Sequence, residues 1–349
     1  PRVVSRPERP AAGNAPMARI LIVSPTLAEA NTGNWQTARR WARFLRRDFH
    51  VRVASGWNGE PDDAMIALHA RRSAAAIAGF AATGRPVALV LTGTDLYRDI
   101  RGDPGAQRSL ALARRLVVLQ PQGLEELAPP LRGKASVIEQ SARPMSPGRP
   151  RQRTFDLLLV GHLRPEKDPL TAVRALERLD DPPSRRLRLV QVGGALDEAL
   201  ARQVRDAARR DARIELRGPL PHAATRALIR RGRVLLLPSR IEGGANVLIE
   251  AVTSGVPVLA SRIGGSVGLL GDDYDGFFPV GDDAALAALI RRCRDEPAFL
   301  ERLRAQCARR ARRFTPAREG AAVLALAHNL LPGGRARRAP APSSRKSER

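Results

Sequence analysis

Residues 233–261 have the sequence RVLLLPSRIEGGANVLIEAVTSGVPVLAS and contain a complete unit of alternating strand and helix. The apolar runs 233–239 and 256–261 predict two buried strands. A helix that starts near Ala245 is expected to connect them. A strand, a helix and a second strand of this kind form the βαβ unit of parallel sheets. The unit therefore predicts the fold class of the chain around it.

The same alternation continues on both sides of this unit. Further strands are expected at 18–24, 50–55, 65–70, 86–93, 115–120, 135–141, 155–162, 186–194 and 213–218. Residues 142–153 are rich in Pro, Gly and Arg and separate two series of strands. We therefore predict an α/β protein with two doubly wound, Rossmann-like domains that face each other across a cleft.

The domain boundaries follow from these runs. We expect a disordered tail at 1–17, an N-terminal domain at 18–142, a linker at 143–153, a C-terminal domain at 154–315, a C-terminal helix at 316–331 and a disordered basic tail at 332–349. The apolar runs are shorter than a membrane span, and the start of the sequence lacks the apolar core of a signal peptide. We expect a cytoplasmic protein without stable membrane insertion.

The charge of the chain is strongly positive but is carried almost entirely by arginine. Lys and Arg number 59 and Asp and Glu 35, which gives a net charge of +24, and the only lysines are Lys134, Lys167 and Lys346. No nucleic-acid recognition motif accompanies this charge, so we expect no nucleic-acid partner. A nucleic-acid-binding or assembly protein that uses the arginine surface and tails is kept as a third alternative.

Several sequence motifs of common cofactor, nucleotide and metal sites do not occur. Neither the GxGxxG fingerprint of dinucleotide-binding proteins nor the GxxxxGK[ST] loop of P-loop NTPases occurs, so we expect no cofactor. Cys293 and Cys307 do not have zinc-site spacing. Asp272, Asp273 and Asp275 are interpreted as a turn in GDDYDG and not as a metal site.

Two glutamates bracket the glycines of the opening stretch. Glu242 and Glu250 are separated by seven residues, and Gly243 and Gly244 lie between them. Glycines let a ligand approach the backbone, and the start of a helix attracts a diphosphate. The Glu250 carboxylate can accept hydrogen bonds from the paired hydroxyls of a ribose, and Glu242 can meet the hydroxyls of a sugar. The alternative is a surface helix with an ordinary glutamate and two turn glycines.

Residues 238–261 resemble the GT-B glycosyltransferases of family 4, whose signature is PSxxEGxxxxxxEAxxxGxPVxAS. The similarity extends from Arg19 to about Leu331. It implies a nucleotide-sugar donor, with Glu250 on the ribose and Glu242 on the donor sugar. It further implies that the sugar and the diphosphate are lined by Gly243, Gly244, Ala245 and Asn246.

A second element of that family is a G-R-L-x-x-x-K loop whose Arg and Lys neutralise the diphosphate. Here residues 161–169 are GHLRPEKDP, so Lys167 matches and His162 replaces the Arg. We expect Arg164 to supply the second cation that the leaving diphosphate requires. The alternative for Lys167 is a solvated cation at a helix start. The stretch 261–271, SRIGGSVGLLG, lacks the glutamate that the family usually has there.

The N-terminal half is similar to a narrower branch, the selenosugar synthases of selenoneine biosynthesis. The similarity lies in TLAEANTGNWQTARRW (26–41), ALHARRS (67–73), LTGTDLYRDI (91–100) and LQPQ (119–122). It implies transfer of a hexose from UDP-N-acetylglucosamine or UDP-glucose to selenophosphate. Because this selenium is anionic near neutral pH, the site needs no general base.

The acceptor residues are expected at the ends of strands in this half, where loops face the cleft. They are Gly33, Asn34, His69, Arg71, Arg72, Thr94 and Asp95. The two arginines can hold a small phosphate-like anion, or they can form a solvated helix start, and His69 can simply pack or cap.

The first rival hypothesis is a family 4 transferase that acts on a hydroxyl of a lipid or a saccharide. The stretch 38–47, ARRWARFLRR, has the composition of a basic amphipathic helix that binds a membrane surface, which keeps this alternative open.

Overall fold

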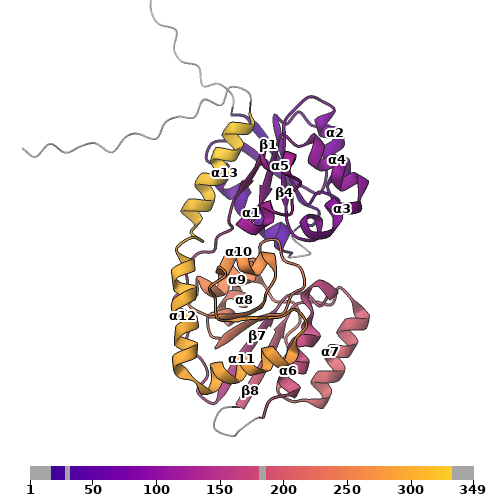
Figure 1. Ribbon diagram of the computed structural model, residues 1–349. Coiled ribbons are helices and arrows are strands. Elements are labelled where there is room, and N and C mark those ends of the chain that lie inside the picture. Colours follow the sequence, from indigo (N-terminus) through magenta and orange to yellow (C-terminus); the bar gives the residue numbers. More distant parts are fainter. Residues whose placement is uncertain (1–16, 28–31, 181–185, 332–349) are drawn as a thin grey trace, which may run out of the picture.

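The computed structural model describes residues 17–27, 32–180 and 186–331 (Figure 1). The tails predicted at 1–17 and 332–349 lie outside these residues, apart from Met17. The described chain forms two six-stranded sheets, one in each half of the sequence. All strand pairs in both sheets are parallel.

The first sheet has the strand order β2-β1-β3-β4-β5-β6. Its strands are β1 (Arg19–Val23), β2 (His50–Ala54), β3 (Ala64–Leu68), β4 (Val87–Leu91), β5 (Arg115–Val118) and β6 (Ala135–Val137). Its helices are α1 (Gly33–Leu45), α2 (Ala74–Ala81), the π-turn η2 (Asp95–Asp99), α3 (Ile100–Gly102), α4 (Pro104–Leu112), the 3-10 turn η3 (Pro121–Leu124) and α5 (Pro129–Arg132).

The second sheet has the strand order β12-β11-β10-β7-β8-β9. Its strands are β7 (Thr154–Val160), β8 (Arg186–Val192), β9 (Ile214–Leu216), β10 (Val234–Leu237), β11 (Val258–Ser261) and β12 (Phe277–Phe278). The helical segments that follow β7 are the 3-10 turn η4 (Pro165–Lys167), α6 (Pro169–Glu177), α7 (Glu198–Arg210), α8 (His222–Ile229), α9 (Asn246–Val252), α10 (Gly264–Leu270), α11 (Asp283–Asp295), α12 (Pro297–Ala311) and α13 (Pro316–Leu330).

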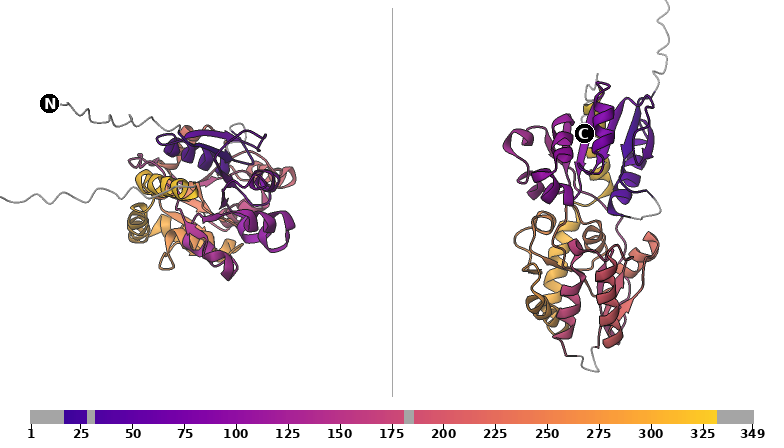
Figure 2. Two further views of the ribbon diagram at one scale, coloured as in Figure 1. Left: turned by 90° about the horizontal axis from the view of Figure 1, so that it is seen from above. Right: turned by 90° about the vertical axis from the view of Figure 1, so that its right-hand side faces the viewer.

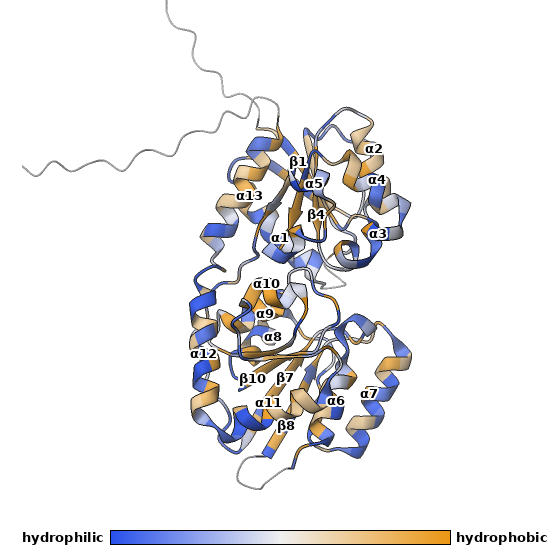
Figure 3. Cartoon of the chain, in the orientation of Figure 1, coloured by the Kyte–Doolittle hydropathy of each residue, from blue (hydrophilic) through white to orange (hydrophobic). Residues whose placement is uncertain are grey.

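Strands β3 and β4 show why the sequence forms covered parallel sheets. Their sequences, AMIAL and VALVL, are apolar throughout, and every residue in them is buried. Continuous apolar runs are typical of parallel strands with helices on both faces. Figure 3 shows apolar strands in the interior and more polar helices around them. The prediction of two doubly wound α/β units is confirmed.

Aspartate side chains mark where several helices begin. Asp197 accepts a hydrogen bond from the N–H of Leu200 at 2.9 Å at the start of α7, and Asp282 accepts one from Ala285 at 2.8 Å at the start of α11. Such caps satisfy N–H groups that lack a partner within the helix. Pro297 starts α12. Within the described ranges, no helix is both long and apolar enough to cross a bilayer.

Helix α13 returns to the first sheet although it follows the second sheet in the chain. Its Val323 and Leu330 pack in one apolar cluster with Trp41 of α1. Figures 1 and 2 show α12 along the second sheet and α13 along the first. We call the first sheet with its helices and α13 the N-terminal domain, and the second sheet with α6 to α12 the C-terminal domain. An ion pair between Arg313 and Glu139 joins the two segments that connect these domains.

Each sheet has one place where the strand order reverses. It lies between β1 and β3 in the first sheet and between β7 and β10 in the second. The loops after such a pair of strands leave toward opposite faces and open a crevice at the carboxyl edge of the sheet, where doubly wound proteins bind ligands. The predicted site residues at 69–72, 161–168 and 238–245 lie in these loops.

Candidate active site where the two domains meet

The carboxyl edges of the two sheets meet each other (Figure 1). The loop after β4 lies directly against the loop after β10, because a Cβ atom placed on Gly243 would be 2.4 Å from the carbonyl oxygen of Thr92. Arg98 of η2 pairs across the same boundary with Glu166 of η4, with 3.3 Å between Nη1 and Oε1. The residues predicted for donor and acceptor therefore lie on facing sides of one interface.

Glu242 and Lys167 form the centre of the C-terminal side. Lys167 Nζ donates to Glu242 Oε1 at 2.5 Å, and Ser239 Oγ donates to the same oxygen at 2.6 Å. A lysine ammonium has three hydrogens, and within the described part of the chain only one of them has a partner. Two hydrogens remain for an anion. A small hollow beside the pair is lined by Gly161, His162, Lys167, Pro238 and Ser239.

Arg164 and His162 differ in what they can offer. The Arg164 guanidinium has no hydrogen-bond or ion-pair partner among the described residues, and the side chain is partly exposed. His162 Nδ1 accepts a hydrogen bond from the N–H of Gly194 at 3.1 Å. In the neutral ring the hydrogen is then on Nε2. Arg164 is thus the group in this loop that can supply a second permanent positive charge beside Lys167.

Glu250 lies on α9 and contacts a residue that sequence reasoning missed. His222, the first residue of α8, has its Nε2 atom 2.6 Å from Glu250 Oε1. The Glu250 side chain is 12% exposed. Its Oε2 atom makes no hydrogen bond to a described residue, so one carboxylate oxygen can still accept a hydrogen bond from a hydroxyl.

The glycines between the two glutamates lie where the C-terminal domain closely approaches the N-terminal domain. A Cβ atom on Gly244 would be 2.6 Å from the Cβ of Leu119, slightly farther than the 2.4 Å contact at Gly243. Ala245 is buried and precedes α9, which has only seven residues. The sequence explained these glycines by the approach of a ligand. The structure adds a second reason, which is the approach of the N-terminal domain.

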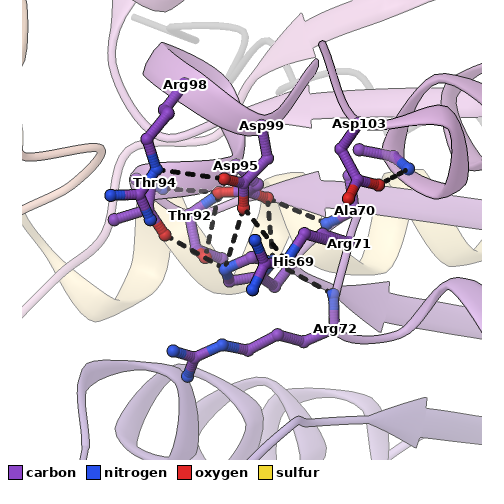
Figure 4. Close-up of polar contacts among 12 residues, drawn as sticks. His69, Ala70, Arg71, Arg72, Thr92, Thr94, Asp95, Arg98, Asp99 and Asp103 are labelled. Carbon is purple, nitrogen blue, oxygen red and sulfur yellow. Dashed lines mark hydrogen bonds and ion pairs between the residues drawn. The ribbon is translucent and has the colours of Figure 1, made fainter. Parts of the chain in front are cut away.

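His69 has an unusual backbone conformation at the end of β3 (Figure 4). Its φ angle is +74°, which few residues other than glycine adopt, and the predicted strand at 65–70 therefore ends at Leu68. Its Nδ1 accepts from the N–H of Arg72 at 3.4 Å, and its Nε2 lies 3.1 Å from Thr94 Oγ1. Both ring nitrogens are thus engaged. Burial lowers the pKa of His69 below its usual value.

Asp95 ties the two loops of the N-terminal side together. Its side chain is fully buried. Oδ1 accepts from the N–H groups of Thr92 at 2.9 Å and Gly93 at 2.8 Å, and Oδ2 accepts from the N–H of Ala70 at 3.0 Å. These bonds occupy the carboxylate with backbone groups, so it holds the loop after β3 against the loop after β4 (Figure 4).

The two arginines of the predicted anion site point in different directions. Arg71 lies beside His69, with its Nε 3.9 Å from Oδ2 of the buried Asp99. Arg72 extends away from this cluster (Figure 4) and has no carboxylate partner within the described part of the chain. Arg72 is therefore the more available of the two for an anion, while Arg71 is partly neutralised by Asp99.

Gly33 and Asn34 begin α1, after residues 28–31, which lie outside the described residues. The carbonyl of Gly33 accepts a hydrogen bond from Asn246 Nδ2 at 3.4 Å. Asn34 is partly buried. A predicted acceptor residue and a predicted donor residue thus contact each other across the interface.

The acidic run at 272–275 forms turns, as predicted, and its carboxylates pair with arginines. Asp273 pairs with Arg310 at 2.6 Å and Asp275 with Arg302 at 2.9 Å. Among the residues with a described position, no three potential metal-ligating side chains come together.

Ser239, His222 and Asp99 are the site residues that sequence reasoning missed. Ser239 belongs to the quoted stretch, and its position three residues before Glu242 was a usable signal. Asp99 is four residues after Asp95 and shares its buried side of η2. No sequence pattern indicated His222, since its partner Glu250 is 28 residues further along the chain.

Comparison with known proteins shows which family the second half of the chain resembles. Residues 154–296 match the family described as glycosyl transferases group 1. The chain is 33% identical over 174 residues to the glycogen synthase of Mycobacterium tuberculosis, a match that covers 49% of this chain and 41% of that protein. It is 29% identical over 295 residues to the D-inositol 3-phosphate glycosyltransferase of Streptomyces coelicolor, which covers 80% of this chain and 62% of that protein. The chain thus spans less than two thirds of these relatives.

Solved structures establish the fold. Sucrose-phosphate synthase from Thermosynechococcus elongatus superimposes with a TM-score of 0.71 at 16% identity, covering 90% of this chain and 99% of that one. Anabaena HepE in complex with UDP and glucose gives 0.70 at 15% identity, covering 89% and 100%. The predicted GT-B fold is confirmed. The predicted enzyme class, a glycosyltransferase, agrees with the family that the second half matches.

Proposed function

We propose that this chain is a glycosyltransferase that moves a hexose from a UDP-sugar to a small anion, and that this anion is selenophosphate. The donor would be UDP-N-acetylglucosamine or UDP-glucose. In the reaction the bond between the sugar C1 and the diphosphate oxygen breaks, a bond between C1 and selenium forms, and UDP leaves.

The donor part of the proposal rests on the Glu242–Lys167 pair. Glu242 is oriented by Ser239 and Lys167, and the remaining lysine hydrogens together with Arg164 can meet the diphosphate. Negative charge on the leaving group grows in the transition state, so cations placed there accelerate the reaction. Glu250, held by His222, would bind the ribose. The structural neighbour HepE, which binds UDP and glucose, supports a donor of this class.

The observation that carries the acceptor part is that His69 and Asp95, the two predicted acceptor residues that could act as a base, are both engaged. Both ring nitrogens of His69 are engaged, and the Asp95 carboxylate is occupied by three backbone N–H groups. A hydroxyl acceptor has to lose a proton, whereas the selenium of selenophosphate is already anionic. Arg72, with Arg71 beside it, would attract the charged acceptor.

The rival hypothesis proposes that α1 binds a membrane surface, but the apolar face of this helix is already buried in the protein. Ala38, Trp41, Ala42 and Leu45 of α1 are buried in the core of the N-terminal domain. A membrane surface would meet only the arginine face, which favours a water-soluble acceptor. The name of the inositol 3-phosphate relatives also points to a small phosphate-bearing acceptor. We place the reaction in the cytoplasm, where the buried free thiols of Cys293 and Cys307 stay reduced.

The test is to incubate the protein with each UDP-sugar and selenophosphate under reducing conditions. Mass spectrometry should detect UDP and a sugar that contains selenium. Inositol 3-phosphate and a saccharide serve as hydroxyl acceptors in parallel. Arg72→Ala should raise the selenophosphate concentration that is needed without changing UDP-sugar binding, and Arg47→Ala in the exposed turn after α1 is the matched control. Transfer to a hydroxyl acceptor with no selenium product would refute the selenophosphate assignment and leave the donor site standing.

A further inference from the structure

Asn246 is held by the N-terminal domain through both ends of its amide. Its Nδ2 donates to the carbonyl of Gly33 at 3.4 Å, and its Oδ1 accepts from Arg40 Nη2 at 3.2 Å. Both partners belong to α1, whereas Asn246 directly follows the loop Gly243–Ala245 in the C-terminal domain. The side chain that directly follows Gly243–Ala245, which we call the donor loop, is thus fixed by two groups from the opposite domain.

The side chain of Arg40 is oriented by a buried carboxylate of α13. Glu319 has a side chain with 0% exposure, and its Oε2 accepts from Arg40 Nε at 2.7 Å. The same carboxylate accepts from Trp41 Nε1 at 2.8 Å and from the N–H of Ser141 at 2.9 Å. A buried charge is stable only when it is paired and hydrogen-bonded. Glu319 therefore fixes the Arg40 guanidinium in one orientation.

The Glu319 cluster joins three separate parts of the chain. Glu319 comes from the last helix, Arg40 and Trp41 from α1, and Ser141 from the segment that connects the two domains. The outer end of Arg40 then reaches the donor loop at Asn246. Arg39 and Arg43, its neighbours on α1, are exposed and have no carboxylate partner among the described residues. Arg40 is thus distinguished from the solvated arginines of the same helix by two oriented contacts.

We propose that Arg40 is a positioning residue for the donor. By holding Asn246 it fixes the backbone at Gly243–Ala245 against the N-terminal domain, and Glu319 determines where the guanidinium points. This inference rests on the proposed function, because it assumes that the donor binds at that loop. The positioned group is the backbone that surrounds the diphosphate, so UDP affinity depends on a residue that need not touch the nucleotide.

Arg40→Lys separates this role from a purely structural one. A lysine can keep the charge next to Glu319, but its single ammonium cannot reproduce the fork that contacts Glu319 and Asn246 together. We expect Arg40→Lys to keep the thermal stability of the wild type and to weaken UDP binding about tenfold, measured by titration calorimetry. Arg40→Ala should weaken it at least as much. Arg39→Ala and Arg43→Ala are matched controls and should bind UDP like the wild type.

A double-mutant cycle tests the contact itself. If Arg40 acts through Asn246, Arg40→Ala should change UDP affinity much less in an Asn246→Ala background than in the wild type. Wild-type UDP affinity in Arg40→Lys and Arg40→Ala, or full additivity with Asn246→Ala, would overturn the inference. A wild-type protein that binds no UDP would instead refute the proposed donor site, so the two failures are distinguishable.

Discussion

Replacing Asp95 by asparagine tests whether this residue holds the site together or contacts the acceptor. The carboxylate is fully buried and accepts three backbone hydrogen bonds, from Thr92, Gly93 and Ala70. Asparagine has nearly the same shape but offers only one oxygen. If that oxygen keeps the bonds to Thr92 and Gly93, the new NH2 group faces the N–H of Ala70, and two donors then meet without an acceptor.

The structure sets the size of this effect. The change removes a hydrogen bond to a charged group, which is worth about 1.5 to 3 kcal/mol, and leaves a buried N–H without a partner. We therefore expect Asp95→Asn to lower the free energy of unfolding by about 3 kcal/mol. For a domain of this size, such a loss lowers the melting temperature by roughly 6 to 12 °C.

Thermal unfolding followed by circular dichroism measures this shift. Asp103→Asn is the matched control, because Asp103 caps α4 by accepting from the N–H of Ala106 at 2.8 Å and asparagine caps helices as well as aspartate does. The control should melt close to the wild type. A melting temperature of Asp95→Asn within about 1 °C of the wild type would refute the reasoning, and a loss of acceptor binding at full stability would assign Asp95 to the acceptor.

Four further predictions concern the facing loops. Glu250→Ala should weaken UDP binding at least tenfold with the fold intact, and unchanged affinity in calorimetry would remove this residue from the site. Arg164→Ala should lower the turnover number more than the donor affinity in steady-state kinetics, and full turnover would show that Arg164 does not replace the missing family arginine. Gly243→Ala should destabilise the protein by about 1 to 3 kcal/mol and reduce UDP binding, because its Cβ would lie 2.4 Å from the opposite backbone. Gly133→Ala, with no atom within 4 Å, is its control, and equal stability of the two variants in urea denaturation would contradict the close approach. Burial lowers the pKa of His69 in the folded protein, so between pH 7 and pH 5 the imidazole binds a proton less readily there than in the unfolded chain, where its ordinary pKa is 6.5. The unfolded state then binds more protons, so stability should fall from pH 7 to pH 5. His69→Asn should flatten that dependence, and an identical pH profile for the two proteins would count against the buried neutral imidazole.

The sequence predicted the fold because its main signal is local. Continuous apolar runs such as those of β3 and β4 are what a parallel sheet with two covered faces requires, and they alternate with helical segments along the chain. The turn predicted at 272–275 was also correct, since clustered aspartates act within a few residues. The predicted ends of the helices and strands were less accurate. The strand expected at 65–70 ends at Leu68, because His69 adopts a positive φ angle that no local sequence pattern predicts.

For the candidate site, the sequence by itself determined which residue types are present and which of them share a loop. Glu242 and Glu250 bracket a glycine pair and Lys167 follows a strand, and the resemblance to family 4 then selected them as candidate site residues. Only the tertiary structure decided how these groups are paired. Lys167 meets Glu242 across 75 residues, His222 meets Glu250 across 28, and Arg40 meets Glu319 across 279. Such pairs depend on the order of the strands in each sheet and on the return of α13 to the first sheet. Both result from the burial of apolar surface over the whole chain, and a local spacing contains no information about them.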